Sequence, residues 1–565
     1  MKSEAGERLN REKHSGVFPA AAIEACLAAG GIELGDLDHV GFGWKPSISY
    51  WHIPVYALKY FPKVFTLIRE SSGWTMEEEL GAVTFLRQMR RLPRTLRRLA
   101  GSGPKPLFKF HFLEHHMCHA ASAFYPSPFD EAAILTVDGS GEWATALLAV
   151  GRETRIQKIA TVNTPHSLGA FYHAISRYLG FEYLEGPGKL MGLASYGDRD
   201  ADQYRKLRTM IRFTKDGRFR MDMSYFSYHY TRKNCGLSDK FYRVMGPANT
   251  AAKDWTDAQL NIAAGAQRIV EEAFLHMAQH LHKVTGSKNL CIAGGVGLNS
   301  VANGRLVKES PFQGFFIQPA ASDSGTSLGA ALLIHHGLLG NERGYRMTDA
   351  FLGPGYPAEC YTAALDKHKL PRVESPDCAA IAARLLAAEK IVGWFQGRME
   401  FGPRALGNRS ILANPCIRDM KDTLNARVKF RESFRPFAPI VIEQRCGDYF
   451  DCAYPSPYML NVYGVREDKR ELLPAITHVD GTARVQTVTR DANPELFELL
   501  AAFEREAGVP VLLNTSFNVK GEPIVCTPED AVACFTKTDM DFLVIGRNVV
   551  GKTADDLELI RRALA

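Results

Sequence analysis

The sequence predicts an α/β protein built from two large domains. Its 565 residues exceed what one hydrophobic core normally serves, and short apolar runs alternate with helical patterns along the whole chain. The composition, 46% apolar and 23% charged, excludes a mainly disordered chain. Buried strands are expected in two groups, at Ala132–Val137, Leu147–Val150, Leu290–Ala293 and Phe315–Gln318, and then at Ile391–Phe395, Pro439–Ile442, Val511–Asn514 and Phe542–Ile545.

A long amphipathic helix is expected inside the first group of strands. Its apolar residues recur with helical spacing from about Ala258 to Val284, and Thr256 and Asp257 are cap candidates. Further on, the stretch Gly337–Pro357 carries seven glycines or prolines in 21 residues and has no strong periodicity. The domain boundary is therefore expected there, which gives domains of residues 1–350 and 351–565.

Composition and charge exclude several classes of protein. No run of 18 apolar residues exists, so no membrane partner is expected, and Met1–His14 lacks the apolar region of a secretory signal. Eleven cysteines without a CxxC pair fit reduced thiols and a cytoplasmic location. The net charge of +6 comes largely from eight basic residues between Arg87 and Lys109, so the chain as a whole is not expected to bind nucleic acid. An oligomer is neither predicted nor excluded.

The basic stretch itself has apolar residues at near-helical spacing. We interpret it as a solvated helical face that is interrupted at Pro93. The alternative interpretation is a contact with phosphate or RNA.

The segment HHMCH offers two histidine pairs that could hold one metal ion. His115 and His119 are four residues apart and His116 and His119 are three apart, so either pair shares a helical face. The metalloprotease motif is excluded because its general-base glutamate is replaced by His116. A purely structural pair remains the alternative. Asp138, in VDGSG at the end of an apolar strand, favours a site, because a carboxylate before a glycine-rich turn can hold a metal beside phosphates.

Two more segments repeat this pattern. CIAGGVGLNS, residues 291–300, is a strand, a glycine-rich turn and a helix start, which is an arrangement that binds phosphate or ribose. PAASDSG places Asp323 in a turn before another helix.

Taken together, these motifs resemble those of the O-carbamoyltransferases of the tobramycin, cephalosporin and nodulation protein U type, the NodU/CmcH family. The resemblance covers nearly the whole chain, in order. In the first domain it rests on HHMCHAASAFYPSPF, VDGSGE, GPGKLMGLASYGD, AGGVGLNS and PAASDSG. In the second domain it rests on GRMEFGPRALGNRSILANP, KFRESFRPFAP, THVDGTARVQTV and PVLLNTSFN.

The resemblance implies a fold and a reaction. The first domain is expected to have the actin-like ATPase fold (ASKHA, Kae-like) and the second to be a YrdC-like α/β domain. In the family, the second domain converts carbamoyl phosphate and ATP into carbamoyl-adenylate, with release of phosphate and pyrophosphate. The first domain then passes the carbamoyl group to an acceptor hydroxyl of a small natural product or sugar.

The resemblance also implies the residues of the first domain's site. Four residues match the metal ligands, an iron(II) site in characterised members: His115, His119, Asp138 and Asp323. The matches to nucleotide-binding positions, where ATP with Mg(II) is expected, are Lys13, Asp138, Gly139, Ser140, Gly141, Glu142, Ser167, Gly295 and Asn299.

In the second domain, a group of seven cations lies within 38 residues that also contain Arg418 and Lys421. They should repel one another unless an anion or carboxylates lie between them, and guanidinium groups bind phosphate in bidentate fashion. These cations are Arg398, Arg404, Arg409, Arg427, Lys429, Arg431 and Arg435. The resemblance assigns carbamoyl phosphate to Arg404, Arg435, Arg484, Asn514 and Ser516, and a catalytic role to Arg404, Lys429 and Arg435. Lys429 with Arg431, and Ser516 with Asn518, also match the KxR and SxN patterns of YrdC-like proteins.

The match fails at the N-terminus. Family members begin with a β-hairpin that carries an HDxSA turn, and this sequence starts after it, at EAGERLNREKHSGVFP. We expect a misassigned start codon, because no other motif is eroded, and the alternative is a truncated copy. As written, the chain lacks a candidate general base and should expose a sheet edge.

Three functions are therefore compared. The first is the O-carbamoyltransferase. The second is a threonylcarbamoyl transferase that acts on tRNA, for which only the basic stretch offers a surface. The third is an inactive nucleotide-binding homologue. Acceptor contacts are expected in the segments Pro46–Pro106 and Phe213–Trp255, which match no motif.

Overall fold

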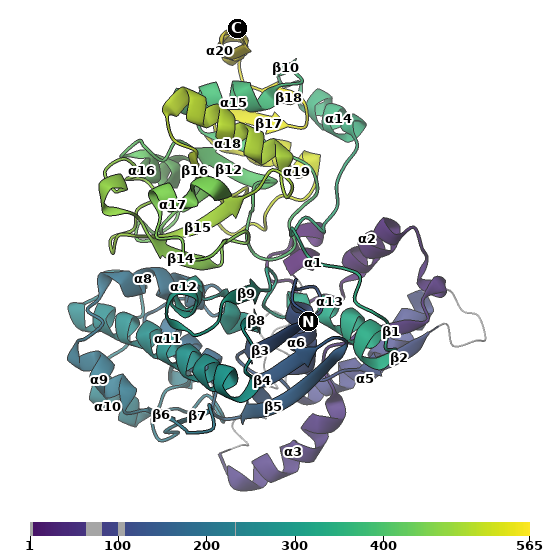
Figure 1. Cartoon of the computed structure of the whole chain (residues 1–565), viewed down its shortest axis with the longest axis vertical. Helices are drawn as coiled ribbons and strands as arrows, with labels where there is room; N and C mark the ends of the chain where they lie inside the picture. The colour runs from purple at the N-terminus through teal and green to yellow at the C-terminus, as the bar shows by residue number, and fades with distance from the viewer. Residues whose placement is uncertain (1–3, 64–81, 100–107, 232, 565) are drawn as a thin grey trace. The chain divides into compact units, whose positions relative to one another are not determined.

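The computed structural model describes residues 4–63, 82–99, 108–231 and 233–564 and divides the chain into two units (Figure 1). The N-terminal unit contains His14–Met347. The C-terminal unit contains Thr348–Ala565 and also the segment Glu4–Lys13. The chain is a mixed α/β protein, as the alternation in the sequence predicted.

A five-stranded sheet forms the centre of the N-terminal unit. β3, β8 and β9 are parallel, and β4 and β5 extend the sheet antiparallel on the side of β3. The strands follow the order β5-β4-β3-β8-β9 and span Glu131–Val137 (β3), Ala144–Arg152 (β4), Arg155–Asn163 (β5), Asn289–Ala293 (β8) and Gly314–Ile317 (β9). The four strands expected in this domain are confirmed.

Helices cover both faces of this sheet. α11 packs against β3 and β4 beside α7 and α12, whereas α6 and α13 pack together on the other face (Figure 1). The predicted Thr256 cap of α11 is confirmed, because its side chain accepts from the Gln259 N–H. The helices of the unit are α2 (Ala20–Gly30), α3 (Pro46–Lys59), α5 (Ala82–Leu99), α6 (His115–Phe124), α7 (Leu168–Tyr178), α8 (Gly186–Leu193), α9 (Asp202–Arg208), α10 (Asp239–Met245), α11 (Asp257–Thr285), α12 (Ser300–Glu309) and α13 (Ser324–Leu332).

Two small sheets complete the N-terminal unit. One pairs β1 (His39–Phe42) with β2 (Lys109–Phe112) in parallel, and the other pairs β6 (Ile211–Phe213) with β7 (Phe219–Met221).

The predicted break at Pro93 is wrong. α5 runs from Ala82 through the proline to Leu99 as one helix. A proline removes one backbone hydrogen bond without preventing the flanking turns from continuing. The strong amphipathic pattern, with Met89 and Leu96 buried, outweighs that loss. Lys105, which belongs to the same basic stretch, lies outside the described residues.

The C-terminal unit is built on a nine-stranded mixed sheet of order β10-β18-β17-β11-β12-β16-β13-β15-β14. Its strands are β10 (Arg372–Glu374), β11 (Val392–Phe395), β12 (Arg409–Ala413), β13 (Ala438–Ile442), β14 (Asn461–Gly464), β15 (Thr482–Val488), β16 (Val511–Ser516), β17 (Phe542–Ile545) and β18 (Asn548–Val550). Its helices are α1 (Glu4–Asn10), α14 (Ala358–His368), α15 (Cys378–Ala387), α16 (Met420–Leu424), α17 (Cys446–Tyr449), α18 (Pro494–Ala507), α19 (Pro528–Lys537) and α20 (Ala554–Leu564). The four strands expected here are also confirmed.

The segment Glu4–Lys13 is held to this unit by two arginines. Arg8, only 2% exposed, donates to the carbonyl oxygens of Glu400, at 2.7 Å, and Gly402. Arg11 donates to the Ile524 carbonyl oxygen at 2.6 Å. The sequence placed residues 1–350 in one domain, whereas the structure groups these ten residues with the C-terminal unit.

Two predicted features concern the whole chain. None of the helices in its described part combines the length and hydrophobicity that a membrane span requires. All eleven cysteines are described, and none forms a disulfide.

Close packing of α13 on α6 gives the first testable prediction. A Cβ atom on Gly329 would lie 1.8 Å from the Cys118 carbonyl oxygen, so Gly329→Ala must push the two helices apart. We expect a loss of about 3 kcal/mol or more in the free energy of unfolding, measured by urea denaturation. Gly35→Ala, where nothing lies within 4 Å, is the control, and equal stability of the two variants would contradict the packing argument.

Candidate functional site

Candidate site residues of the N-terminal unit gather at one edge of its sheet. β3, β8 and β9 are parallel, so their carboxyl ends meet there. Asp138 directly follows β3, Gly294 and Gly295 follow β8, and Asp323 lies in the turn after β9. Ligand sites of open α/β sheets lie at this edge.

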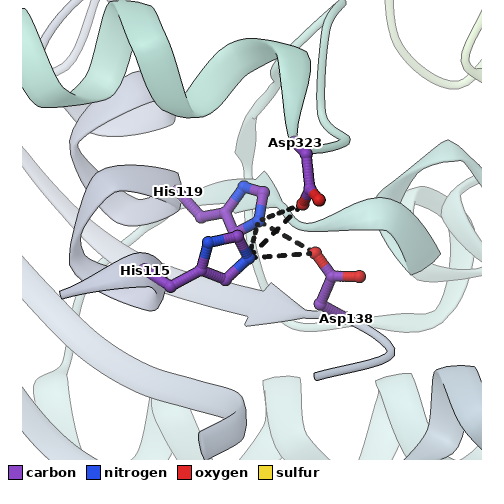
Figure 2. A group of neighbouring side chains, drawn as sticks. All are labelled: His115, His119, Asp138 and Asp323. Atoms are coloured by element: carbon purple, nitrogen blue, oxygen red, sulfur yellow. Dashed lines mark hydrogen bonds and ion pairs between the residues drawn. The ribbon is translucent and has the colours of Figure 1, made fainter. Parts of the chain in front are cut away.

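Four side chains converge at this edge (Figure 2). Nε2 of His119 lies 2.9 Å from the Asp138 carboxylate and 3.6 Å from that of Asp323. Nε2 of His115 lies 3.1 Å from Nε2 of His119 and 3.4 Å from Asp323. The four ligand atoms all lie within 4.8 Å of one another. His115 and His119 come from adjacent turns of α6, as their spacing predicted.

Hydrogen bonds orient the cluster. Nδ1 of His115 lies 3.1 Å from the Gly43 carbonyl oxygen, so the ring can donate there and its Nε2 faces the centre of the cluster. Glu142 accepts from the His115 N–H at 3.0 Å and from the Lys45 N–H, which fixes the start of α6. The Gly139 N–H donates to Oδ1 of Asp138 at 2.6 Å. Such outer partners set the tautomer and direction of a metal ligand.

Opposite charges dominate the electrostatics of the cluster. Burial disfavours the charged form of His115, but the carboxylates of Asp323 and Asp138 outweigh it and raise the pKa of His115 well above its usual value. Burial likewise opposes ionisation of Asp138, and hydrogen bonds from the two histidines hold its pKa well below the usual range. The same histidines lower the pKa of Asp323 to about 2 against desolvation. Without a metal, the ionised carboxylates and the protonated His115 thus stabilise one another. A bound cation would replace the proton at Nε2, and two imidazoles with two carboxylates would then be its donor set.

His116 belongs to a different environment. Its Nδ1 lies 2.6 Å from the Thr136 hydroxyl, and burial, followed by the charges of His115 and His119, lowers its pKa to about 3. Of the two pairs that the sequence left open, the structure brings together His115 and His119 with the carboxylates, and His116 is a packed, neutral neighbour.

The four residues fit a divalent transition metal. In a tetrahedral site with bonds of about 2.1 Å the ligand atoms are ~3.4 Å apart, close to the spacings described above. Two imidazoles and two carboxylates suit Fe(II), Mn(II) or Zn(II) rather than a soft ion. Asp323 is 58% exposed at its side chain, so the site opens toward solvent on that side.

The candidate nucleotide residues of the N-terminal unit surround this cluster. Ser167 donates to the Gly139 carbonyl oxygen at 2.6 Å and caps α7 through the Ala170 N–H. It thereby fixes the Asp138–Glu142 turn, where Ser140 is exposed and the Gly141 N–H donates to the Ala144 carbonyl oxygen.

Gly295 and Asn299 lie just beyond β8. A Cβ atom on Gly295 would lie 3.1 Å from the Asp138 carboxylate, so a side chain there would crowd the cluster. Asn299 is buried and caps α12. Lys13 is grouped instead with the C-terminal unit.

A cluster of cations marks the C-terminal unit. Burial and then the charges of three arginines lower the pKa of Arg484 well below its usual value: Arg404, Arg431 and Arg435. Burial and Arg435 likewise lower the pKa of Arg431 to about 9. Arg484 lies on β15, and its buried Nε has no hydrogen-bond partner among the described residues. Guanidinium groups that destabilise one another in this way are stabilised by an anion between them.

Lys429 lies at the edge of this cluster and is anchored. Its Nζ donates to the carbonyl oxygen of Ser516 at 2.8 Å and to Oδ1 of Asn518 at 2.8 Å. Burial, followed by the charge of Arg431, lowers the pKa of Lys429 well below its usual value. The SxN pattern therefore positions the lysine of the KxR pattern.

The loop that carries Arg404 is fixed by two side chains. The buried Glu400 accepts from the N–H groups of Leu406, Asn408 and Arg409 at 2.8–3.0 Å. Asn514 donates to the Ala405 carbonyl oxygen at 2.9 Å, and its Oδ1 is buried without a hydrogen-bond partner among the described residues.

Three cations of the predicted group of seven have other partners. Arg409 is fully buried and donates to the carbonyl oxygens of Gln396 and Asn408. Arg427 pairs with Asp541 at 2.8 Å, and Arg398 donates to the Gly353 carbonyl oxygen at 2.9 Å. The expectation that these seven cations need an anion between them therefore applies to only part of the group. Sequence spacing cannot separate these roles, because carbonyl partners are set by the fold.

Sequence reasoning missed the residues that support the sites. The carboxylate of Glu400 accepts from backbone N–H groups, Gly43 offers its carbonyl oxygen, and Arg8 joins a segment to a loop almost 400 positions away. Each carries a charge or a small side chain of an ordinary kind, so no local pattern marks its role.

Comparison with known proteins adds the following. The family models described as "Carbamoyltransferase N-terminus" and "Carbamoyltransferase C-terminus" match residues 4–332 and 383–552. An uncharacterized protein of Synechocystis sp. is 42% identical over 97% of this chain and 92% of its own. Nodulation protein NolNO of Sinorhizobium fredii is 37% identical over 99% of this chain and 78% of its own. Full-length HypF in a phosphate- and nucleotide-bound crystal structure overlaps 47% of this chain and 51% of its own, at 16% identity and a TM-score of 0.29, so it does not bear on the fold.

The histidine cluster gives a testable prediction about metal content. His119→Ala removes one of four ligands, so we expect metal affinity to fall about a hundredfold or more. Metal in the purified protein is measured by mass spectrometry of the elements. His116→Asn, which changes the neighbouring imidazole outside the cluster, should keep its metal. Equal metal content in His119→Ala and the unmodified chain would contradict the ligand assignment.

Proposed function

This chain belongs to the carbamoyltransferase family and is a transferase, and we propose that it is an ATP-dependent O-carbamoyltransferase with a small natural product or sugar as acceptor. One observation supports the proposal: Arg404, Arg431 and Arg435 lie close enough to Arg484 to lower its pKa, and a multiply charged anion among them would remove that repulsion. Carbamoyl phosphate is such an anion.

In the proposed first stage, the C-terminal unit activates the carbamoyl group. Water first hydrolyses carbamoyl phosphate to carbamate and phosphate. A carbamate oxygen then attacks the α-phosphorus of ATP, and the bond from that phosphorus to pyrophosphate breaks, which leaves carbamoyl-adenylate. Arg404 and Arg435 hold the phosphate of the donor, and Arg484 meets carbamate or pyrophosphate. Lys429 already donates to Ser516 and Asn518, so its nitrogen is positioned without a rearrangement, and an anion bound beside it would favour its charged form.

In the proposed second stage, the N-terminal unit transfers the carbamoyl group. The acceptor hydroxyl attacks the carbamoyl carbon, AMP leaves, and the hydroxyl proton is lost to a base. His115, His119, Asp138 and Asp323 would hold the metal, which we propose to be Fe(II), and a bound metal would supply Lewis-acid polarisation of an oxygen. The glycine-rich turns beside the cluster, with few side chains in the way, suit the adenylate and its Mg(II).

The finer fold assignment belongs to the same proposal. A five-stranded sheet with its site at the carboxyl edge supports an actin-like (ASKHA) N-terminal domain, proposed as residues 1–350. The KxR and SxN side chains that meet at Lys429 support a YrdC-like domain, proposed as residues 351–565. A cytoplasmic location stays a prediction.

The arginine cluster gives a prediction that needs no acceptor. Pyrophosphate release from ATP should depend on carbamoyl phosphate, and Arg404→Ala should lower its rate at least about a hundredfold, because the variant loses a charged contact to the donor. Arg418→Ala, an exposed arginine of the same unit, is the control and should keep full release. Unchanged release in Arg404→Ala would remove this residue from the site, and no release in the unmodified chain would favour the inactive homologue.

The two stages can be separated with one more variant. His119→Ala should keep carbamoyl-phosphate-dependent pyrophosphate release, because the proposed activation uses residues of the C-terminal unit only. A parallel loss of metal and of pyrophosphate release would contradict this division of labour.

A further inference from the structure

Helix α3 presents an apolar stripe to solvent. Trp51, Val55 and Leu58 are spaced i, i+4 and i+7, so they share one helical face, and Phe61 follows just after the helix. All four are between 64% and 82% exposed. Large apolar side chains scattered singly on a surface are ordinary, but a contiguous stripe of four marks a contact surface.

The opposite face of α3 is the one packed on the N-terminal unit. His52 stacks on Trp143 with ring centroids 4.1 Å apart, and the Tyr56 hydroxyl donates to the His229 carbonyl oxygen at 2.6 Å. Hydrogen bonding and ring stacking therefore fix the orientation of the helix, and its apolar stripe is turned outward. Figure 1 shows α3 at the periphery of the unit.

Helix α5 adds positive charge beside this stripe. Arg90, Arg91, Arg94, Arg97 and Arg98 are all exposed. The Arg90 guanidinium lies over the Tyr50 ring of α3, 5.5 Å from its centroid, so the two helices are neighbours. Among the described residues, none of the five arginines forms an ion pair, and the sequence of α5 contains no acidic residue.

A hollow lies along the inner side of α5. Pro93 and Arg97 line it on the helix side, and Phe110 and Phe112 line it on the side of β2. Asp38 and Lys109 also line it, so the hollow combines aromatic rings with charges of both signs. The stripe of α3 and the arginines of α5, rather than this hollow, favour a docking surface.

We infer that α3 and α5 together form a docking surface for an anionic lipid bilayer. Exposed Trp, Leu, Val and Phe side chains would enter the boundary between headgroups and acyl chains, while the arginines meet the anionic headgroups. A duplex nucleic acid would engage the arginines but gives no partner to Val55 and Leu58. Pairing with a second copy of the chain would bury the apolar stripes. It would also bring two sets of five arginines together, and their repulsion opposes such a dimer.

Flotation with lipid vesicles tests this inference on the whole chain. The protein should float with phosphatidylcholine vesicles that contain phosphatidylserine, float far less with phosphatidylcholine alone, and be released by salt. Trp51→Ser combined with Leu58→Ser should weaken binding at least about tenfold. Arg94→Gln and Arg97→Gln should each weaken it about fivefold.

The control is Leu338→Ser combined with Leu339→Ser, two apolar residues of the same unit that are about half exposed. This variant should bind vesicles like the unmodified chain, and unchanged circular dichroism should accompany all variants because the altered side chains are exposed. Absence of flotation, or equal flotation of the Trp51 and Leu58 variant, would overturn the inference. Two results in the absence of vesicle binding would also overturn it. One is salt-sensitive retention of tRNA, and the other is a dimer of the unmodified chain that the Trp51 and Leu58 variant no longer forms.

Discussion

The N-terminal site depends on the parallel pairing of β3 with β8 and of β8 with β9. Because the three strands end at one edge, residues nearly two hundred positions apart meet there: Asp138 after β3 and Asp323 after β9. α6 then has to lie close to that edge for its histidines to complete the cluster. The contact of Gly329 with the backbone of α6 allows this approach, so the geometry of the cluster is a consequence of sheet order and of one missing side chain.

The C-terminal site is organised by an electrostatic constraint: several arginines lie close to Arg484, whose Nε is buried, and Glu432, which pairs with Arg435 at 3.7 Å, offsets part of their repulsion. Arg404, Arg431 and Arg484 raise one another's free energy, and the surrounding loops keep them together. Buried Glu400 gives its Oε1 to three backbone N–H groups, which holds the loop that carries Arg404. The repulsion between these arginines raises the free energy of the unliganded site, and an anion lowers it. Because the loops are already fixed, little reorganisation accompanies binding, which favours an anion of matching shape.

Sequence reasoning reached the strands and the long helix α11 from apolar runs and helical spacing. It reached the full set of four residues in the histidine cluster through the family resemblance, since the local spacing alone left His116 as an alternative ligand. It failed at Pro93, where burial of Met89 and Leu96 outweighs one lost hydrogen bond. It also failed for Glu4–Lys13, because the carbonyl partners of Arg8 and Arg11 lie on distant loops. The charge of Arg409 and that of Arg404 look alike in sequence, and only tertiary hydrogen bonds tell them apart.

Remaining hydrogen-bond capacity distinguishes the candidate residues further. Asn299 is occupied on both sides, since its Oδ1 accepts from the Ala302 N–H and its Nδ2 donates to Gln267. Asn514 donates to the Ala405 carbonyl oxygen but keeps a buried Oδ1 without a partner among the described residues. A buried acceptor left unpaired costs roughly 1–3 kcal/mol, and a donor N–H of the carbamoyl group would remove that cost. Under the proposed function, the amide of carbamoyl phosphate would donate to this unpaired oxygen, and its phosphate would lie among the arginines around Arg484.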